Sequence, residues 1–202
     1  MIPVLPPLPE ITTHLPLSHS DYVRASTQLD CQVACIKSVV EVESGSGGFL
    51  PSGRPKILFE AHQFSRLTEH AHDNKHPKVS SRKWDQSLYV GGEGEYARLL
   101  EAMRLDRNAA LQSASWGRFQ IMGFNYHSAG FNSVEKFVLA MFYSEGNHLD
   151  AFVSFIKSSK LDKALRDMDW VAFARGYNGG AYRKNNYDIK LRSAYEKFRN
   201  EH

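Results

Sequence analysis

The fold is decided by the stretch VVEVESGSGGF at residues 39–49, where a predicted helix ends in a glycine-rich run. Apolar residues recur at spacings of three and four from Val33 to Val40, which places them on one face of that helix. Glu43 comes three residues after Val40 and continues the same face. We therefore predict a helix that ends at Glu43, with the carboxylate directed at the apolar interior.

Glu41 lies on the opposite side of this helix, four residues after Lys37, where the two side chains can pair in water. A carboxylate on an apolar face has its charged form disfavoured, so its pKa rises, and this suits a general acid near neutral pH. The glycines after Glu43 leave little bulk beside it. A structural carboxylate that caps a loop or pairs with an arginine is the alternative, and this stretch alone leaves both interpretations open.

The composition indicates a globular protein, with 42% hydrophobic and 12% aromatic residues in 202. This length fits one domain with a substantial core. The net charge of +3 is too small to indicate nucleic-acid binding, although it favours approach to an anionic polymer. We therefore expect no nucleic-acid partner. Since the sequence also has no apolar run long enough to cross a bilayer, we expect no membrane insertion.

The start of the chain and its two cysteines indicate the cellular compartment in which the protein is made. The first residues, MIPVLPP, lack a basic region and are interrupted by prolines, so they do not resemble a secretory signal. Cys31 and Cys35 are four residues apart on one predicted helix, a poor geometry for a disulfide, and they lack metal-ligand spacing. We expect buried free thiols and synthesis in the cytoplasm without a signal peptide.

Residues 1–17 contain five of the eight prolines and are expected to form an extended arm that is dispensable for chemistry. Residues 18–202 form the predicted domain, whose first helix can be capped by Ser18 or Ser20. Two short extended pieces around residues 51–53 predict a hairpin at about residues 48–60. Further amphipathic stripes predict helices around residues 96–103, 134–142, 149–156, 170–177 and 187–198.

This order of elements predicts a mainly helical domain and argues against a parallel nucleotide-binding sheet, which needs alternating strands and helices. Residues 70–83 are polar and basic and contain three histidines within seven residues. A metal site is one interpretation, but a solvated loop that touches an anionic substrate is favoured, because no further ligand converges there. We expect no metal and no cofactor.

Three segments carry a family resemblance: Glu43-Ser44-Gly45, GRFQIMG at residues 117–123 and ARGYNGG at residues 174–180. In this order they resemble the Glu-Ser, Gly-x-x-Gln and Tyr-Asn-x-Gly motifs of goose-type lysozymes and soluble lytic transglycosylases. GRPKILFEAH at residues 53–62 and ASWGRFQIMG at residues 114–123 more closely resemble the N-acetylmuramidase domain of phage endolysins and their bacterial relatives. The resemblance covers most of residues 18–200.

The resemblance implies an α+β lysozyme-like fold, mainly α, with a small β-hairpin beside a cleft. It also implies cleavage of the β-1,4 bond between N-acetylmuramic acid and N-acetylglucosamine in peptidoglycan. Glu43 corresponds to the general acid of the family. The residues expected to bind substrate are Ser44, Trp116, Gln120, Tyr177 and Asn178. Amide groups and aromatic faces suit sugar recognition, although core packing is the alternative for the aromatic residues.

Most glycosidases use two carboxylates. Glu60, at the end of the predicted hairpin, is the best second candidate, and a structural pair with His62 or an arginine is its alternative. Glu145 is a weaker candidate, since the following Gly146-Asn147 favours a role at a helix end.

Two other activities remain open: a lytic transglycosylase, which needs one acid and leaves 1,6-anhydro ends, and a non-catalytic wall-binding or interaction module on a decayed lysozyme fold. We expect the protein to act on the wall in the periplasm, either as an endolysin released by a holin or as an antibacterial effector delivered by a secretion system. An effector would have an immunity protein as its partner.

Overall fold

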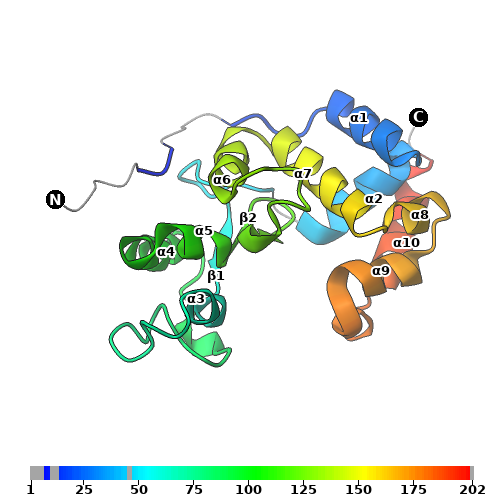
Figure 1. Cartoon of the computed structure of the whole chain (residues 1–202). Coiled ribbons are helices and arrows are strands. Elements are labelled where there is room, and N and C mark those ends of the chain that lie inside the picture. Colours follow the sequence, from blue (N-terminus) through cyan, green and yellow to red (C-terminus); the bar gives the residue numbers. More distant parts are fainter. Residues whose placement is uncertain (1–6, 10–13, 45–46, 201–202) are drawn as a thin grey trace.

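The computed structural model describes residues 7–9, 14–44 and 47–200. It confirms the predicted fold class, because the chain is mainly helical with one small sheet (Figure 1). The α-helices are α1 (His19–Leu29), α2 (Val33–Ser44), α3 (Ala61–Leu67), α4 (Gly94–Leu105), α5 (Arg107–Gln112), α6 (Val134–Tyr143), α7 (Glu145–Ser158), α8 (Asp162–Arg166), α9 (Trp170–Asn178) and α10 (Tyr187–Phe198). The strands are β1 (Ile57–Phe59), β2 (Ala114–Trp116) and β3 (Ile121–Met122), and short 3-10 helices are η1 (Gln86–Leu88), η2 (Gly123–Asn125) and η3 (Gly179–Arg183).

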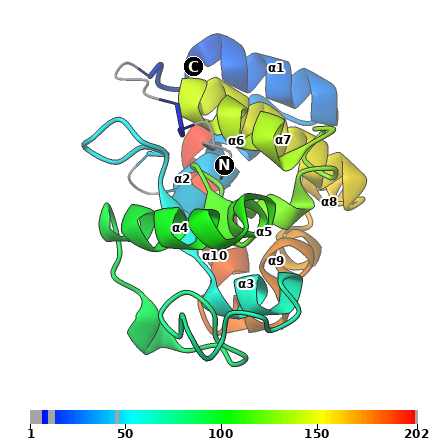
Figure 2. The ribbon, with the colours of Figure 1, turned by 60° about the vertical axis from the view of Figure 1, so that its left-hand side comes forward.

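The helices form two groups. Helix α2 packs against α1 and α10, α10 contacts α9, and α1 contacts α7. In the second group α4 packs against β1, and α5 packs against β2 and α6. Figures 1 and 2 show α3, α4 and α5 on the part of the molecule away from α1 and α8. The segment between α2 and β1 connects the first group of helices to the sheet. Glu43 lies at the end of α2, where this segment begins.

The core combines the apolar stripes that the sequence predicts. Ile36 and Val39 of α2 and Leu149 and Phe152 of α7 are fully buried. Burying one such side chain contributes roughly 1.5–3 kcal/mol relative to leaving it exposed. The stripe on α2 that carries Glu43 at its end therefore faces the interior, as its spacing predicts.

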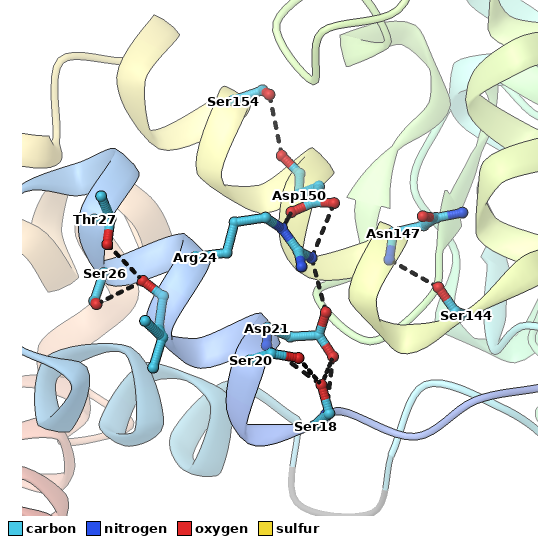
Figure 3. Close-up of polar contacts among 11 residues, drawn as sticks. Ser18, Ser20, Asp21, Arg24, Ser26, Thr27, Ser144, Asn147, Asp150 and Ser154 are labelled. Carbon is cyan, nitrogen blue, oxygen red and sulfur yellow. Dashed lines mark hydrogen bonds and ion pairs between the residues drawn. The ribbon is translucent and has the colours of Figure 1, made fainter.

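Helix α1 is capped by Ser18, one of the two serines that the sequence offered. The Ser18 hydroxyl accepts from the Asp21 amide at 3.3 Å, and the Asp21 carboxylate accepts from the Ser18 amide at 2.9 Å, which is a capping box. Arg24 then donates to both carboxylate oxygens of Asp150 on α7, at 3.0 and 3.1 Å (Figure 3). These contacts fix α1 on α7, and Figure 3 also shows Ser144 at the start of α7, where it caps Asn147.

The sheet is larger than the predicted hairpin. Phe49 and Pro55 form an isolated bridge around the turn at residues 51–53, so a narrow hairpin is present within residues 48–60. Strand β1 pairs antiparallel with β2, and β2 with β3, in the order β1-β2-β3. The sequence pattern missed β2 and β3 because strands of three and two residues show no recognisable alternation.

The arm is attached to the domain by its last residues. His14 stacks on Phe49 with ring centroids 4.0 Å apart. Leu15 forms a parallel bridge with Ser144, and its carbonyl accepts from the Glu145 amide at 3.0 Å. These contacts attach the end of the arm to the domain, while its dispensability for chemistry stays a prediction. Residues 1–6 and 10–13 of the arm lie outside the described residues.

Candidate active site

A cavity of about 480 Å³ lies where α2, the sheet and the loop before α4 meet. Four segments of the chain contribute to its lining, and three of them are the motif regions at residues 43–50, 56–58 and 117–120. The lining residues are Glu43, Gly47, Leu50, Lys56, Ile57, Leu58, Gly91, Gly92, Gly117, Arg118 and Gln120. The cavity therefore brings together segments that the sequence places far apart.

Glu43 occupies the last turn of α2 and is partly buried. The Asn178 side-chain amide donates to both of its carboxylate oxygens, at 3.2 and 3.4 Å. Burial raises the pKa of Glu43 above its ordinary value, and the Asn178 hydrogen bond and the positive charge of Lys190 only partly oppose this rise. A carboxylic acid with a raised pKa beside an open cavity is chemically suited to donate a proton.

Glu41 has the environment that its helical phase predicts. It faces α10, where it forms an ion pair with Lys197 at 2.6 Å, and 42% of its side chain is exposed. Two glutamates two residues apart thus lie in different surroundings, and only Glu43 lines the cavity next to the sheet.

Asn178 and Tyr177 end α9 on the other side of Glu43. The side-chain oxygen Oδ1 of Asn178 is buried and has no hydrogen-bond partner among the described residues. Tyr177 donates its hydroxyl to the Phe119 carbonyl at 3.1 Å, and its ring stacks on Phe173 with centroids 5.8 Å apart. Burial, with a smaller effect of the Glu43 charge, raises the pKa of Tyr177 well above its ordinary value. Tyr177 therefore holds the β2–β3 turn against α9.

Gln120 lines the cavity, but its amide is bound by the protein. Its oxygen accepts from the Ser115 hydroxyl at 2.8 Å, and its nitrogen donates to the carbonyls of Gly117 at 2.8 Å and Lys56 at 3.2 Å. The backbone of Gln120 has a positive φ of 48°, which is unfavourable for a residue other than glycine. These three bonds hold the strained turn that forms one wall of the cavity.

His148 of α7 is fully buried behind the same wall. Its Nδ1 accepts from the Arg118 amide at 3.1 Å, so the proton lies on Nε2, which donates to the Met141 carbonyl at 2.7 Å. Burial lowers the pKa of His148 to about 4, so the ring is neutral at neutral pH. A Cβ on Gly48 would lie 2.4 Å from His148 Nδ1, and one on Gly117, where φ is +69°, would lie 3.0 Å from the ring. Only glycine fits at both positions.

Glu145 connects four segments around this wall. Its carboxylate accepts from the amides of Gly48 at 2.6 Å and Leu17 at 3.3 Å and pairs with Arg118 at 2.7 Å. Desolvation raises the pKa of Glu145, but these hydrogen bonds and the Arg118 charge outweigh it and hold the pKa below its ordinary value. Glu145 therefore acts as a structural anion that connects Leu17, Gly48 and Arg118, and it is not among the residues that line the cavity.

Glu95 and Arg98 of α4 organise the opposite wall. Glu95 is fully buried and accepts from the amides of Phe59 at 3.1 Å, Val90 at 2.7 Å and Gly91 at 3.0 Å. Arg98 pairs with Glu95 at 2.7 Å and donates to the Phe59 carbonyl at 2.9 Å. The pair thus joins the end of β1 to the glycine loop that lines the cavity. The local sequence around Glu95 and Arg98 offers one signal of this pair, namely two opposite charges three residues apart, each next to an apolar residue, Tyr96 or Leu99.

Glu60 follows β1 directly and is partly buried. Its Oε2 accepts from the Tyr89 hydroxyl at 2.7 Å and lies 3.2 Å from His62 Nδ1. The contact with His62 is the alternative that the sequence left open. Because side chains alternate along an extended chain, Glu60 lies on the same side as Leu58, which lines the cavity. Glu60 itself is not part of the lining.

Trp116 and Ser44 are two of the residues that the sequence predicts to contact substrate. Trp116 is only 1% exposed, donates its indole N–H to the Leu111 carbonyl at 3.0 Å and packs on Phe142. The prediction that Trp116 contacts substrate does not hold in this structure, because the ring is part of the core. Ser44 is the last residue of α2, and its side chain lies outside the described residues.

The histidine-rich region forms separate local contacts. His70 contacts the Ser65 hydroxyl at 2.8 Å and Asp73 at 3.5 Å, and His76 contacts Glu101 at 3.2 Å. Within the described ranges, no group of three or more potential ligand side chains is arranged to hold a metal ion. In the same ranges Cys31 and Cys35 are both free thiols, and no helix combines the length and apolar character that crossing a bilayer requires.

Comparisons with known proteins identify the family of the chain. The family model for N-acetylmuramidase matches residues 32–199. Among solved structures, the Burkholderia AP3 phage endolysin matches with a TM-score of 0.84 and 42% sequence identity, over 90% of this chain and 70% of that chain. A search of curated proteins found no match. The chain belongs to the N-acetylmuramidase family of peptidoglycan hydrolases.

Proposed function

We propose that the protein is a muramidase that cleaves the β-1,4 bond between N-acetylmuramic acid and N-acetylglucosamine, with Glu43 as general acid. The observation that carries this proposal is a partly buried carboxyl group with a raised pKa, held by Asn178 at the edge of a 480 Å³ cavity. A cavity of this volume suits a small number of sugar rings.

In this mechanism Glu43 transfers its proton to the bridging oxygen as the bond from that oxygen to the anomeric carbon breaks. The Asn178 amide holds the carboxyl group in place before transfer and stabilises the carboxylate that remains. Positive charge develops at the anomeric carbon, and water then adds there and gives its proton to a carboxylate, either Glu60 or the Glu43 carboxylate that the first step leaves. Gln120 and Tyr177 contribute by fixing the walls of the cavity, through the bonds described above.

We assign Glu60 the role of the second carboxylate, which places water or stabilises the positive charge at the sugar. Its position beyond Leu58 at the end of β1 supports this assignment. Its contacts with Tyr89 and His62 favour the alternative that a single acid acts. A lytic transglycosylase would fit that alternative: the O6 hydroxyl of the muramic acid attacks its own anomeric carbon, its proton passes to the Glu43 carboxylate, and no water is needed.

Product analysis distinguishes these activities. Purified sacculi are digested with the protein, and the soluble fragments are identified by mass spectrometry. A muramidase leaves reducing N-acetylmuramic acid ends, whereas a transglycosylase leaves 1,6-anhydro ends that lack the mass of one water. Intact sacculi after incubation with folded protein would contradict both activities and support a non-catalytic wall-binding module.

The site of action follows from the substrate. We propose that the protein works on the cell wall in the periplasm, either as an endolysin after holin release or as a delivered antibacterial effector. An effector would require an immunity protein in the producing cell. Co-expression with neighbouring genes, scored as rescue from lysis, tests which genes belong to this system.

A further inference from the structure

Trp84 differs from the other tryptophans of the chain. Trp116 and Trp170 are 1% and 4% exposed, whereas 59% of Trp84 is exposed. A single exposed apolar residue is common on protein surfaces and by itself indicates no function. Two features distinguish Trp84: its ring is held by contacts with Tyr89, and Tyr89 contacts Glu60 next to the proposed cleft.

The indole ring of Trp84 is held in one orientation. Its N–H donates to the Tyr89 hydroxyl at 2.8 Å, and the two rings pack edge to face with centroids 6.4 Å apart. Tyr89 in turn donates to Glu60 at 2.7 Å. Ordering a large exposed side chain costs conformational entropy. Because the Trp84 ring is already ordered, a ligand that packs on it would bind without that entropy cost.

The backbone around Trp84 is also anchored next to the proposed catalytic cleft. The Ser81 amide donates to the carbonyl of Ala61, the residue after Glu60, at 3.2 Å. On the other side, the Asp85 carboxylate accepts from the Ser87 amide at 2.9 Å and caps η1, which leads to Tyr89. Gly91 and Gly92, which line the cavity, follow within three residues of Tyr89.

We propose that Trp84 is a sugar-stacking residue that binds a pyranose ring of the glycan strand beyond the cavity. This inference rests on the proposed function, which supplies an extended polymer of N-acetylated hexosamines as ligand. The faces of such sugars present C–H groups that pack on aromatic rings, while their hydroxyl and amide groups stay in water. Val90, which follows Tyr89 in the sequence, is also exposed, at 68%.

The test for binding uses the tryptophan fluorescence of Glu43→Gln protein with N-acetylglucosamine hexamer as the probe. Acrylamide reaches the exposed Trp84 and not the two buried indoles, so quenching reports Trp84. We expect the hexamer to reduce quenching, and we expect no such effect in Glu43→Gln protein that also carries Trp84→Phe. Unchanged quenching at saturating hexamer would overturn the proposal.

The kinetic test uses Trp84→Ala on soluble peptidoglycan strands. We expect KM to rise roughly 2- to 10-fold with kcat near wild type, the range for one aromatic contact, and Trp84→Phe to recover part of it. Tyr143→Ala removes a comparably exposed aromatic ring, 53% accessible on α6, and should leave both constants unchanged. A wild-type KM in folded Trp84→Ala protein would overturn the proposal while leaving the proposed cleavage intact.

The two proposals fail separately. If wild-type protein releases no fragments from sacculi, the proposed function fails. Protection of Trp84 by the hexamer would then still support the stacking site, because quenching does not depend on turnover.

Discussion

Replacing Glu43 by glutamine tests the proposed chemistry with little change in shape. The side-chain oxygen of glutamine still accepts a hydrogen bond from the Asn178 amide, which lies 3.2 Å from Glu43 Oε1 in the wild type. The substitution removes the proton that the mechanism transfers. Since a positioned general acid contributes about 10²–10⁴-fold, we expect kcat to fall by at least that range.

Glu41→Gln is the matched control, because it makes the same chemical change two residues away on the same helix. It removes the ion pair with Lys197, but 42% of the Glu41 side chain is exposed to solvent. Exposed pairs contribute about 0–1 kcal/mol. In a protein of this size, we expect the melting temperature to fall by at most about 4 °C and activity to remain near wild type.

The two variants should also differ in how stability depends on pH. Burial raises the pKa of Glu43 in the folded state, so folding favours its protonated form. The stability that this proton contributes is fully present below the unfolded value of 4.5 and is lost as pH rises through the folded pKa. At pH 7 the Glu43→Gln protein should therefore melt at the same or a higher temperature than wild type, and the difference should vanish below about pH 4.

The assay is release of soluble fragments from purified peptidoglycan, with thermal melting of each variant between pH 4 and 8. An inactive Glu41→Gln protein beside an active Glu43→Gln protein would refute the assignment of the acid. A Glu43→Gln protein that is inactive but melts far below wild type would show that the carboxylate is structural.

The remaining predictions concern the surroundings of Glu43. Glu60→Gln should lower kcat with little change in melting temperature, and wild-type turnover in the folded variant would refute its catalytic role. Glu95→Ala leaves a buried arginine without its carboxylate, which costs about 3–5 kcal/mol, so calorimetry should show melting lowered by roughly 6–20 °C. The pKa of His148 falls from 6.5 to about 4 on folding, so the unfolded chain takes up its proton first. His148 should therefore contribute a loss on the order of 3 kcal/mol from pH 6.5 to 4, measured in urea titrations as the difference in pH dependence between wild type and His148→Gln. A chain that starts at Ser18 should lose stability, because the contacts of residues 14–17 with Phe49 and Glu145 are gone, but should keep its activity while folded; a folded but inactive chain would contradict the prediction that the arm is dispensable for chemistry.

The helical part of this fold could be predicted because the apolar stripes are long. Helix α2 shows three turns of consistent spacing, and that phase alone separated Glu43 from Glu41. The same reasoning identified the end of α9 at Asn178, where glycines follow. In both places the local sequence and the tertiary structure favour the same conformation.

The rest depended on long-range contacts, which a single sequence does not show. Tryptophan is a residue type that often binds sugars, so the sequence made Trp116 a candidate. Its contacts with Leu111 and Phe142, which only the structure shows, make it part of the core. Glu145 was a weaker candidate for the second carboxylate because it extends an apolar stripe, while the following Gly146-Asn147 favoured a role at a helix end, and Glu145 is indeed the first residue of α7. Its partners Leu17 and Gly48 are 128 and 97 residues away, which explains why no local pattern revealed them.

The hydrogen bond between Asn178 and Glu43 joins residues that are 135 positions apart. During synthesis at about 5–20 residues per second, roughly 7–27 s pass between the two residues. For that interval a nascent chain carries Glu43 without the amide that positions it and without the walls that α7 and α9 support. The order of translation thus delays the assembly of the Glu43 cleft until almost the whole chain has been made.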